Sequence, residues 1–440
     1  MRTPLPDYLT EVLDTCGDDT SGELASYIPE LAHADPDRLA LSLCTVDGTG
    51  YAVGDAAEVA FTIQSISKPF AYALALADHG LEEVSTKVGV EPSGEAFNEL
   101  SLEEESGRPL NPMINAGAIT VHSLLEAERL RRGFAAFAGR DLEVDEQVRS
   151  SELESADRNR AIAYMLRNHG IVETDPQDVV AGYTEQCSLL VTVSDLATMA
   201  ATLANGGVQP VTGEQVVPRW VARQVLSVMA TCGMYDAAGD WFTTVGIPAK
   251  SGVSGGLIGS LPGRAGIAVL SPRLDKHGNS VRGVQVFERL SVDMGMHLME
   301  VPPPARSLVR ERTTLPGGED EGEIYELQGS VDFVGMERLL RDLSDESPRT
   351  SAVVLDLTRV HEVREVGRRM LLEGARRLHL DGHTVSFVDP DGLLAELPQG
   401  AGDHAGDEDA HGGVDGHESV DDDPLIDVGG GINAQVHRRR

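Results

Sequence analysis

The chain has 440 residues, more than one compact core usually contains, so we expect a large domain and at least one smaller one. Its 71 acidic and 36 basic residues leave a formal net charge of −35, which would repel nucleic acids and anionic membranes as partners. No apolar run is long enough to span a bilayer, and the N-terminus lacks the pattern of a secretion signal, so we expect a cytoplasmic protein. The four cysteines lack metal-ligand spacing, which favours a reducing compartment and predicts no metal site.

The first part of the chain predicts strands at its two ends and helices between them. Residues 39–63 read as a β-hairpin around a Gly-rich turn, and residues 65–80 read as a helix with Pro69 in its first turn. Residues 100–245 are mostly helical in pattern, and two apolar segments, 263–271 and 281–290, follow as predicted strands. This order predicts one sheet built from both ends of a domain over residues 1–298, with a helical lobe inserted.

The composition changes after residue 298. Residues 299–322 are rich in Pro, Gly and charge and predict a linker, and residues 323–398 alternate strand, helix, strand, helix and strand, which predicts a small α/β domain. Residues 399–440 are acidic and Gly-rich and predict a disordered tail. Its histidines could bind a metal, but solvated tail residues are the better interpretation: His404, His411, His417 and His437.

Ser65 and Lys68 are the first candidates for chemistry. They lie three residues apart, so a helix would place the hydroxyl and the amine on one face. Burial of this face would favour the neutral amine, which could then take the proton of Ser65 and create a nucleophile. Such S-x-x-K matches are more often surface helix residues, but lysine occurs only four times in this chain, and this match opens an apolar helix.

Lys250, Ser251 and Gly252 form a second element of the same enzyme class. A cation and a hydroxyl in this K-[ST]-G pattern flank the nucleophile, and an open strand edge offers N–H groups to a carbonyl oxygen. The alternative is an ordinary turn. Two of the four lysines fall in two linked motifs in the expected order, which favours catalysis, although the Ser-Asp-Asn element of the class is absent.

Longer motifs make the chain similar to the serine-dependent glutaminases over about residues 20–290. The resemblance implies an α/β (α+β) fold: a β-lactamase/transpeptidase-like domain with an antiparallel sheet and a helical lobe. It also implies hydrolysis of L-glutamine without a cofactor, by a homodimer or homotetramer. The motifs are CTVDGTGYAVGD, FTIQSISKPF, PLNPMINAGAI, SADRNRAIAY, TMAATLANGG, CGMYD and AKSGVSGG.

The resemblance implies roles for matching residues in the reaction. Ser65 matches the nucleophile and Lys68 its base, whereas Tyr183 and Tyr235 match tyrosines that relay protons. Val253 matches a residue whose backbone N–H joins that of Ser65 in an oxyanion hole.

The same resemblance implies residues that bind the two ends of the amino acid. Asn115, Glu152 and Asn159 match groups that hold the α-amino and α-carboxylate ends of glutamine, and Tyr27 matches a pocket tyrosine. Carboxylate and amide groups suit a zwitterion. Taken singly, each residue would more often be a solvated, capping or packing residue, so the assignment depends on the joint match.

Residues 323–395 resemble a STAS domain, the fold of sulfate-transporter tails and anti-sigma-factor antagonists. The phosphorylatable serine of that family is replaced here within Arg364-Glu365-Val366-Gly367. Glu365 could imitate a phosphate, but a first-turn glutamate is the simpler interpretation. We therefore expect a domain that binds an unknown protein partner or regulates assembly.

Two other functions remain open at this point. A β-lactamase or penicillin-binding type of hydrolase would use the same Ser65 and Lys68 but would require export. A catalytically silent STAS signalling protein would not need the full set of motif residues.

Overall fold

The protein is described by a computed structural model. The structure describes residues 3–55, 57–94, 101–300, 307–314, 322–395, 426–427 and 433–434. The chain divides into two compact units, Met1–Val301 and Pro302–Arg440, which are described separately below.

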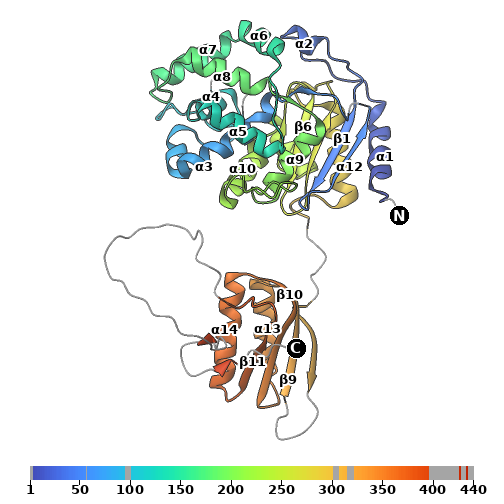
Figure 1. The fold of residues 1–440 in the computed structure, drawn as a ribbon, viewed down its shortest axis with the longest axis vertical. Helices are drawn as coiled ribbons and strands as arrows, with labels where there is room; N and C mark the ends of the chain where they lie inside the picture. Colours follow the sequence, from blue (N-terminus) through green and yellow to red (C-terminus); the bar gives the residue numbers. More distant parts are fainter. Residues whose placement is uncertain are drawn as a thin grey trace. The chain divides into compact units, whose positions relative to one another are not determined.

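A five-stranded antiparallel sheet forms the centre of the first unit (Figure 1). Its order is β2-β1-β7-β6-β5, so that strands from both ends of the unit share one sheet, as the sequence predicts. The predicted hairpin is confirmed, because β1 pairs with β2 through the register from Ala40↔Gly54 to Cys44↔Gly50. The strands are β1 (Ala40–Thr45), β2 (Gly50–Gly54), β5 (Ala249–Ser251), β6 (Gly256–Leu261) and β7 (Ala265–Leu270).

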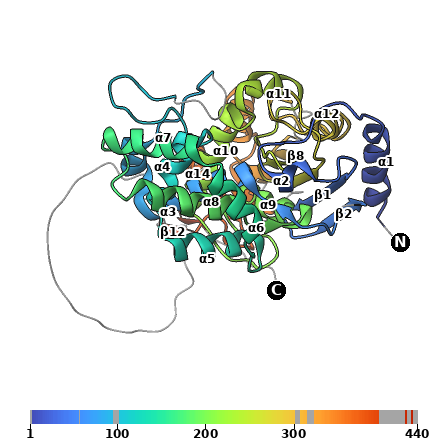
Figure 2. The ribbon, with the colours of Figure 1, turned by 90° about the horizontal axis from the view of Figure 1, so that it is seen from above.

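Helices cover both faces of this sheet. Alternate side chains of a strand point to opposite faces, and accordingly Leu41 and Leu43 pack with α1 (Leu5–Gly17) and α12 (Val281–Met294). Ala40 and Cys44 belong to the core that contains α9 (Val193–Ala204) on the other face. Figure 2 shows α1 next to the β1–β2 edge.

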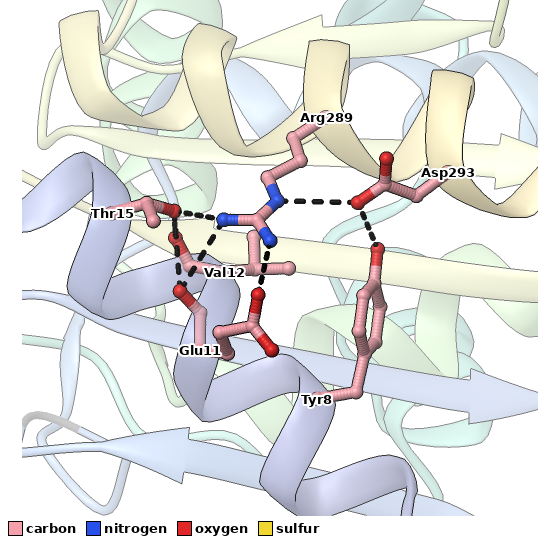
Figure 3. A network of polar contacts seen from close by, with 6 residues as sticks. All are labelled: Tyr8, Glu11, Val12, Thr15, Arg289 and Asp293. Atoms are coloured by element: carbon pink, nitrogen blue, oxygen red, sulfur yellow. Dashed lines mark hydrogen bonds and ion pairs between the residues drawn. The ribbon is translucent and has the colours of Figure 1, made fainter.

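Polar contacts join α1 to α12, the first and last helices of the unit (Figure 3). Arg289 donates to Glu11 Oε1 at 2.6 Å and to Asp293 Oδ2 at 3.1 Å, and it also contacts Thr15 Oγ1. Tyr8 donates its hydroxyl proton to Asp293 Oδ2 at 2.9 Å. One guanidinium thus bridges two helices that are distant in sequence.

A helical lobe packs on the side of the main sheet that α9 covers. The helix predicted over residues 65–80 is confirmed: a short turn, η1 (Gln64–Ile66), leads into α3 (Ser67–Lys87), and Gly80 with φ 78° interrupts it. Strand β3 (Phe61–Thr62), which directly precedes η1 in the chain, pairs with β4 (Leu190–Val191) in a two-stranded sheet. The other elements of this unit are α2 (Pro29–Ala32), α4 (Asn115–Ser123), α5 (Ala127–Ala138), α6 (Glu146–Glu154), α7 (Asp157–Asn168), α8 (Pro176–Cys187), α10 (Arg219–Cys232), η2 (Tyr235–Ala237) and α11 (Ala238–Thr244).

The strand predicted at residues 281–290 is wrong, because this segment belongs to helix α12. The Ser280 side chain accepts a hydrogen bond from the Gly283 N–H at 3.2 Å and caps the helix. Val286, Phe287 and Leu290 then face the core at helical spacing. The apolar residues of this segment predict a strand, but the cap and the spacing of the buried side chains favour a helix.

The second unit contains a four-stranded sheet of order β11-β10-β9-β8. The predicted alternation is confirmed by β9 (Gly322–Val331), α13 (Phe333–Asp345), β10 (Ala352–Val363), α14 (Glu365–Leu380) and β11 (Thr384–Val388). Part of the predicted linker is instead an edge strand, β8 (Val309–Thr314), antiparallel to β9. Edge strands tolerate charge, so its polar sequence resembled a linker.

Most of the predicted tail, including its histidines, lies outside the described residues. Two short strands within it, β12 (Ile426–Asp427) and β13 (Asn433–Ala434), pair antiparallel. In the part of the chain that the structure describes, no helix combines the length and apolar character needed to cross a bilayer.

We predict that Gly266→Ala destabilises the first unit. A methyl group at this position of β7 would overlap the backbone of Ala197 and Ala201 on α9, and such overpacking costs about 1–3 kcal/mol. Gly50→Ala in β2 is the control, because a methyl group there meets no atom within 4 Å. Urea unfolding should show the loss for Gly266→Ala only; equal stability of both variants would contradict the close contact.

Candidate active site

A cavity of about 350 Å³ opens in the first unit beside the start of α3. Its walls come from η1, from the helices α4, α6, α7 and α8, and from the loop after β5. The structure thus brings together residues that are distant in sequence. The predicted site residues that line the cavity are Tyr27, Ser65, Asn115, Glu152, Asn159, Tyr183 and Val253.

Ser65 lies in the η1 turn, with 7% of its surface exposed. The preceding residue, Gln64, has φ 50°, and Tyr235 has φ 57°. Among the described residues, these are the non-glycine residues with positive φ. Such backbone is costly and persists where the surrounding structure holds it in place. Both positions are adjacent to Ser65, in sequence or through the interaction of Tyr235 with Ser65.

Lys68 lies in the first turn of α3 with 1% of its surface exposed. Its Nζ donates to Asn115 Oδ1 at 2.7 Å and to the Met113 carbonyl at 3.2 Å. Both acceptors are uncharged. Burial therefore lowers the pKa of the Lys68 amine from 10.5 to about 8.

Tyr235 and Lys250 share a hydrogen-bond acceptor, the Ser251 carbonyl. The Tyr235 hydroxyl donates to the Ser251 carbonyl at 2.9 Å, and Lys250 Nζ donates to the same oxygen at 2.8 Å. Lys250 Nζ also lies 4.0 Å from the centre of the Tyr235 ring. Burial, with a smaller contribution from the charge of Lys68, holds the pKa of Lys250 well below its ordinary value.

The K-S-G element lies at the open edge of the main sheet, because β5 is a terminal strand. Gly252 lies against Ile66 of the η1 turn, where a methyl group would approach the Ile66 side chain to 3.1 Å. Val253 follows and lines the cavity. The strand edge therefore lies next to the turn that carries Ser65.

Glu152 is the carboxylate of the cavity wall. Its Oε1 accepts hydrogen bonds from the Tyr27 hydroxyl at 2.8 Å and from Gln64 Nε2 at 3.1 Å. Burial raises the pKa of Glu152, and these two hydrogen bonds oppose the change. Tyr27 is half exposed.

Two asparagines, Asn115 and Asn159, also line the cavity. Asn115 Nδ2 donates to Asn159 Oδ1 at 3.1 Å, while Asn115 Oδ1 accepts from Lys68. One amide therefore connects the cavity wall to the buried amine.

Sequence reasoning missed further lining residues. Gln64 could have been noticed because it directly precedes Ser65 in the motif, and Arg158 because it precedes Asn159. The remaining ones carry no signal that separates them from other helix residues: Ser155, Ala156, Thr184 and Cys187.

Comparison with known proteins assigns this arrangement to a family. The glutaminase family profile matches residues 22–299. A glutaminase of Corynebacterium efficiens is 51% identical over 408 residues, covering 90% of this chain and 95% of its own length. The crystal structure of Mglu in its glutamate form has a TM-score of 0.80 and 46% identity, and the match covers 89% of this chain and all of that chain.

A shorter relative is also similar. A glutaminase of Microcystis aeruginosa is 48% identical over 321 residues, which are 71% of this chain and 94% of the relative. The chain belongs to the glutaminase family. It is an enzyme that hydrolyses glutamine to glutamate, which decides against the two alternative functions.

Proposed function

We propose that this glutaminase works through an acyl-enzyme on Ser65. Its Oγ attacks the side-chain amide carbon of L-glutamine, the C–N bond breaks, and ammonia leaves with an added proton. Water then attacks the ester and releases glutamate and the Ser65 hydroxyl. The burial of the Lys68 amine one helical turn after Ser65, where it donates to Asn115 Oδ1 and to the Met113 carbonyl, is the observation that carries this proposal.

Lys68 acts as the general base. With a pKa of about 8, a useful fraction of its amine is neutral near neutral pH and can accept the Ser65 proton. Tyr235 and Tyr183 share the proton transfer to ammonia. Burial raises the pKa of both phenols above their ordinary value, so both remain protonated donors.

The backbone N–H groups of Ser65 and Val253 stabilise the tetrahedral oxyanion. The position of Val253 after the edge strand, on the cavity wall, supports this role. Lys250, Ser251 and Gly252 support the site. The Ser251 carbonyl accepts from the Tyr235 hydroxyl and from Lys250 Nζ, and Gly252 allows the close approach of η1.

Glu152 binds the α-ammonium group of glutamine, and Asn115 and Asn159 bind its α-carboxylate. A carboxylate that is partly buried yet already hydrogen-bonded gives a charged acceptor of fixed orientation. Tyr27 orients Glu152 at the cavity mouth.

We also propose that the second unit is a STAS-like module that binds a protein partner or regulates assembly. Its parallel β9, β10 and β11 strands with two helices support the fold. Glu365 is already paired with Arg368 at 3.0 Å and with Arg369 at 2.6 Å, which favours the helix-stabilising interpretation over phosphate mimicry. A cytoplasmic homodimer or homotetramer completes the proposal; the four buried free cysteines are compatible with a reducing compartment.

We predict that Ser65→Ala lowers kcat at least about a thousandfold, and that Lys68→Arg lowers it at least about a hundredfold, because arginine keeps its charge and cannot act as a base.

In the unchanged enzyme, kcat/KM should rise with pH through about 8, as the neutral fraction of Lys68 increases. Ammonia release measured across pH checks all three statements. A normal rate for Lys68→Arg would remove Lys68 from the role of base.

Glu152→Gln should raise the KM for glutamine about tenfold to a hundredfold and change kcat about threefold or less. The amide keeps the oxygen that Tyr27 contacts but loses the charge that pairs with an ammonium group. Glu154→Gln, an exposed position on the same helix, is the matched control. An unchanged KM for Glu152→Gln would refute ammonium binding by this residue.

Deletion of residues 301–440 should leave kcat and KM within about threefold of the full chain, because each unit has its own core. The similarity to the shorter Microcystis glutaminase supports this expectation. Circular dichroism and a cooperative thermal transition would establish folding of the truncated protein. A folded but inactive fragment would contradict an accessory role for the second unit.

A further inference from the structure

A chain of buried hydrogen bonds lies behind the cavity and connects three helices. Gln186 on α8 donates from Nε2 to Ser67 Oγ at 3.0 Å, and its Oε1 lies 2.9 Å from His122 Nδ1 on α4. Ser67 is the first residue of α3. All three side chains are buried, with exposed fractions of 0% for Ser67, 5% for Gln186 and 9% for His122.

Both ends of this chain lie next to groups that are proposed to move protons. Ser67 directly precedes Lys68, and His122 packs edge-on against the Tyr183 ring, with 6.4 Å between ring centres and an angle of 73°. Gln186 lies three residues after Tyr183, so the two side chains lie on the same side of α8.

The helix α4 contributes to both sides of the site. Asn115, at its first position, accepts the hydrogen bond from Lys68, and His122, seven residues later, contacts Gln186. A spacing of seven residues is close to two helical turns, so both side chains lie on one face of α4. Helix α4 therefore contacts both the Lys68 amine and the hydrogen-bonded chain of Ser67, Gln186 and His122, and it fixes the distance between them.

Gly182 makes room for the histidine. A methyl group at this position would overlap His122 Nε2, so the imidazole lies directly against the α8 backbone beside Tyr183. The thiol of Cys187 on α8 interacts with both Tyr183 and Ser67, which gives a second connection between α8 and α3, beside the one through Gln186.

We propose that Ser67, Gln186 and His122 are positioning residues that hold Lys68 and Tyr183 in a fixed relation for proton transfer at Ser65. Hydrogen bonds are directional, whereas apolar packing of similar volume would permit the helices to shift. None of the three side chains lines the cavity, so their effect is on the reaction and not on the binding of glutamine. This inference rests on the proposed acyl-enzyme function.

The decisive variant is Gln186→Met, which keeps the length of the side chain and removes both hydrogen bonds. We expect kcat to fall about tenfold to a hundredfold, as for small displacements of reacting groups, with KM and the calorimetric affinity for glutamate within about twofold. Ser67→Ala removes one atom from the same network and should show the same loss of kcat, even if Gln186→Met folds poorly. His122→Gln, which can still donate to Gln186, should recover more kcat than His122→Leu.

Val180→Ala is the matched control on α8, because Val180 is a buried packing residue outside the network. It should lower the melting temperature without lowering kcat. The proposal fails if Gln186→Met and Ser67→Ala keep kcat within about twofold, or if their losses appear in KM or follow the melting temperature as in the control. A fully active Ser65→Ala variant would instead overturn the acyl-enzyme function, so the two failures are distinguishable.

Discussion

The burial of the Lys68 amine is the constraint on which the rest of the site depends. Burial of an ammonium group in a protein interior is costly, and the pKa of Lys68 falls to about 8 for this reason. Its Nζ donates to the uncharged oxygens of Asn115 and Met113. A carboxylate at either position would raise the pKa of Lys68 and make it less suited to the proposed role of base.

The architecture of the first unit maintains this burial. The helical lobe encloses Lys68, whereas the main sheet ends in β5 beside η1 and leaves a strand edge next to Ser65. The positive φ angles of Gln64, which precedes Ser65, and of Tyr235, whose side chain interacts with Ser65, show that the backbone at both positions is held in a costly conformation. The cores around the sheet and in the lobe supply the stability that holds it.

Sequence patterns predict most helices and strands of this protein, and the predictions that are wrong have physical causes. The hairpin, the helix after Ser65 and the alternation in the second unit follow from local turns and periodicity. The apolar residues of segment 281–290 predict a strand, but the Ser280 cap and burial on one helical face override that preference. The polar sequence of β8 predicts a linker, because an edge strand needs few apolar residues.

The sequence by itself determined the class of enzyme, and its ordered motifs, which contain Ser65, Lys68 and the K-S-G element, predict a serine acyl transfer. Only the tertiary structure decided which groups meet. Gln64 contacts Glu152, 88 residues away, and Gln186 contacts Ser67, 119 residues away. Such contacts depend on how helices pack, and no local pattern of propensity or spacing encodes them, because packing is selected by the whole core and not by the neighbouring residues.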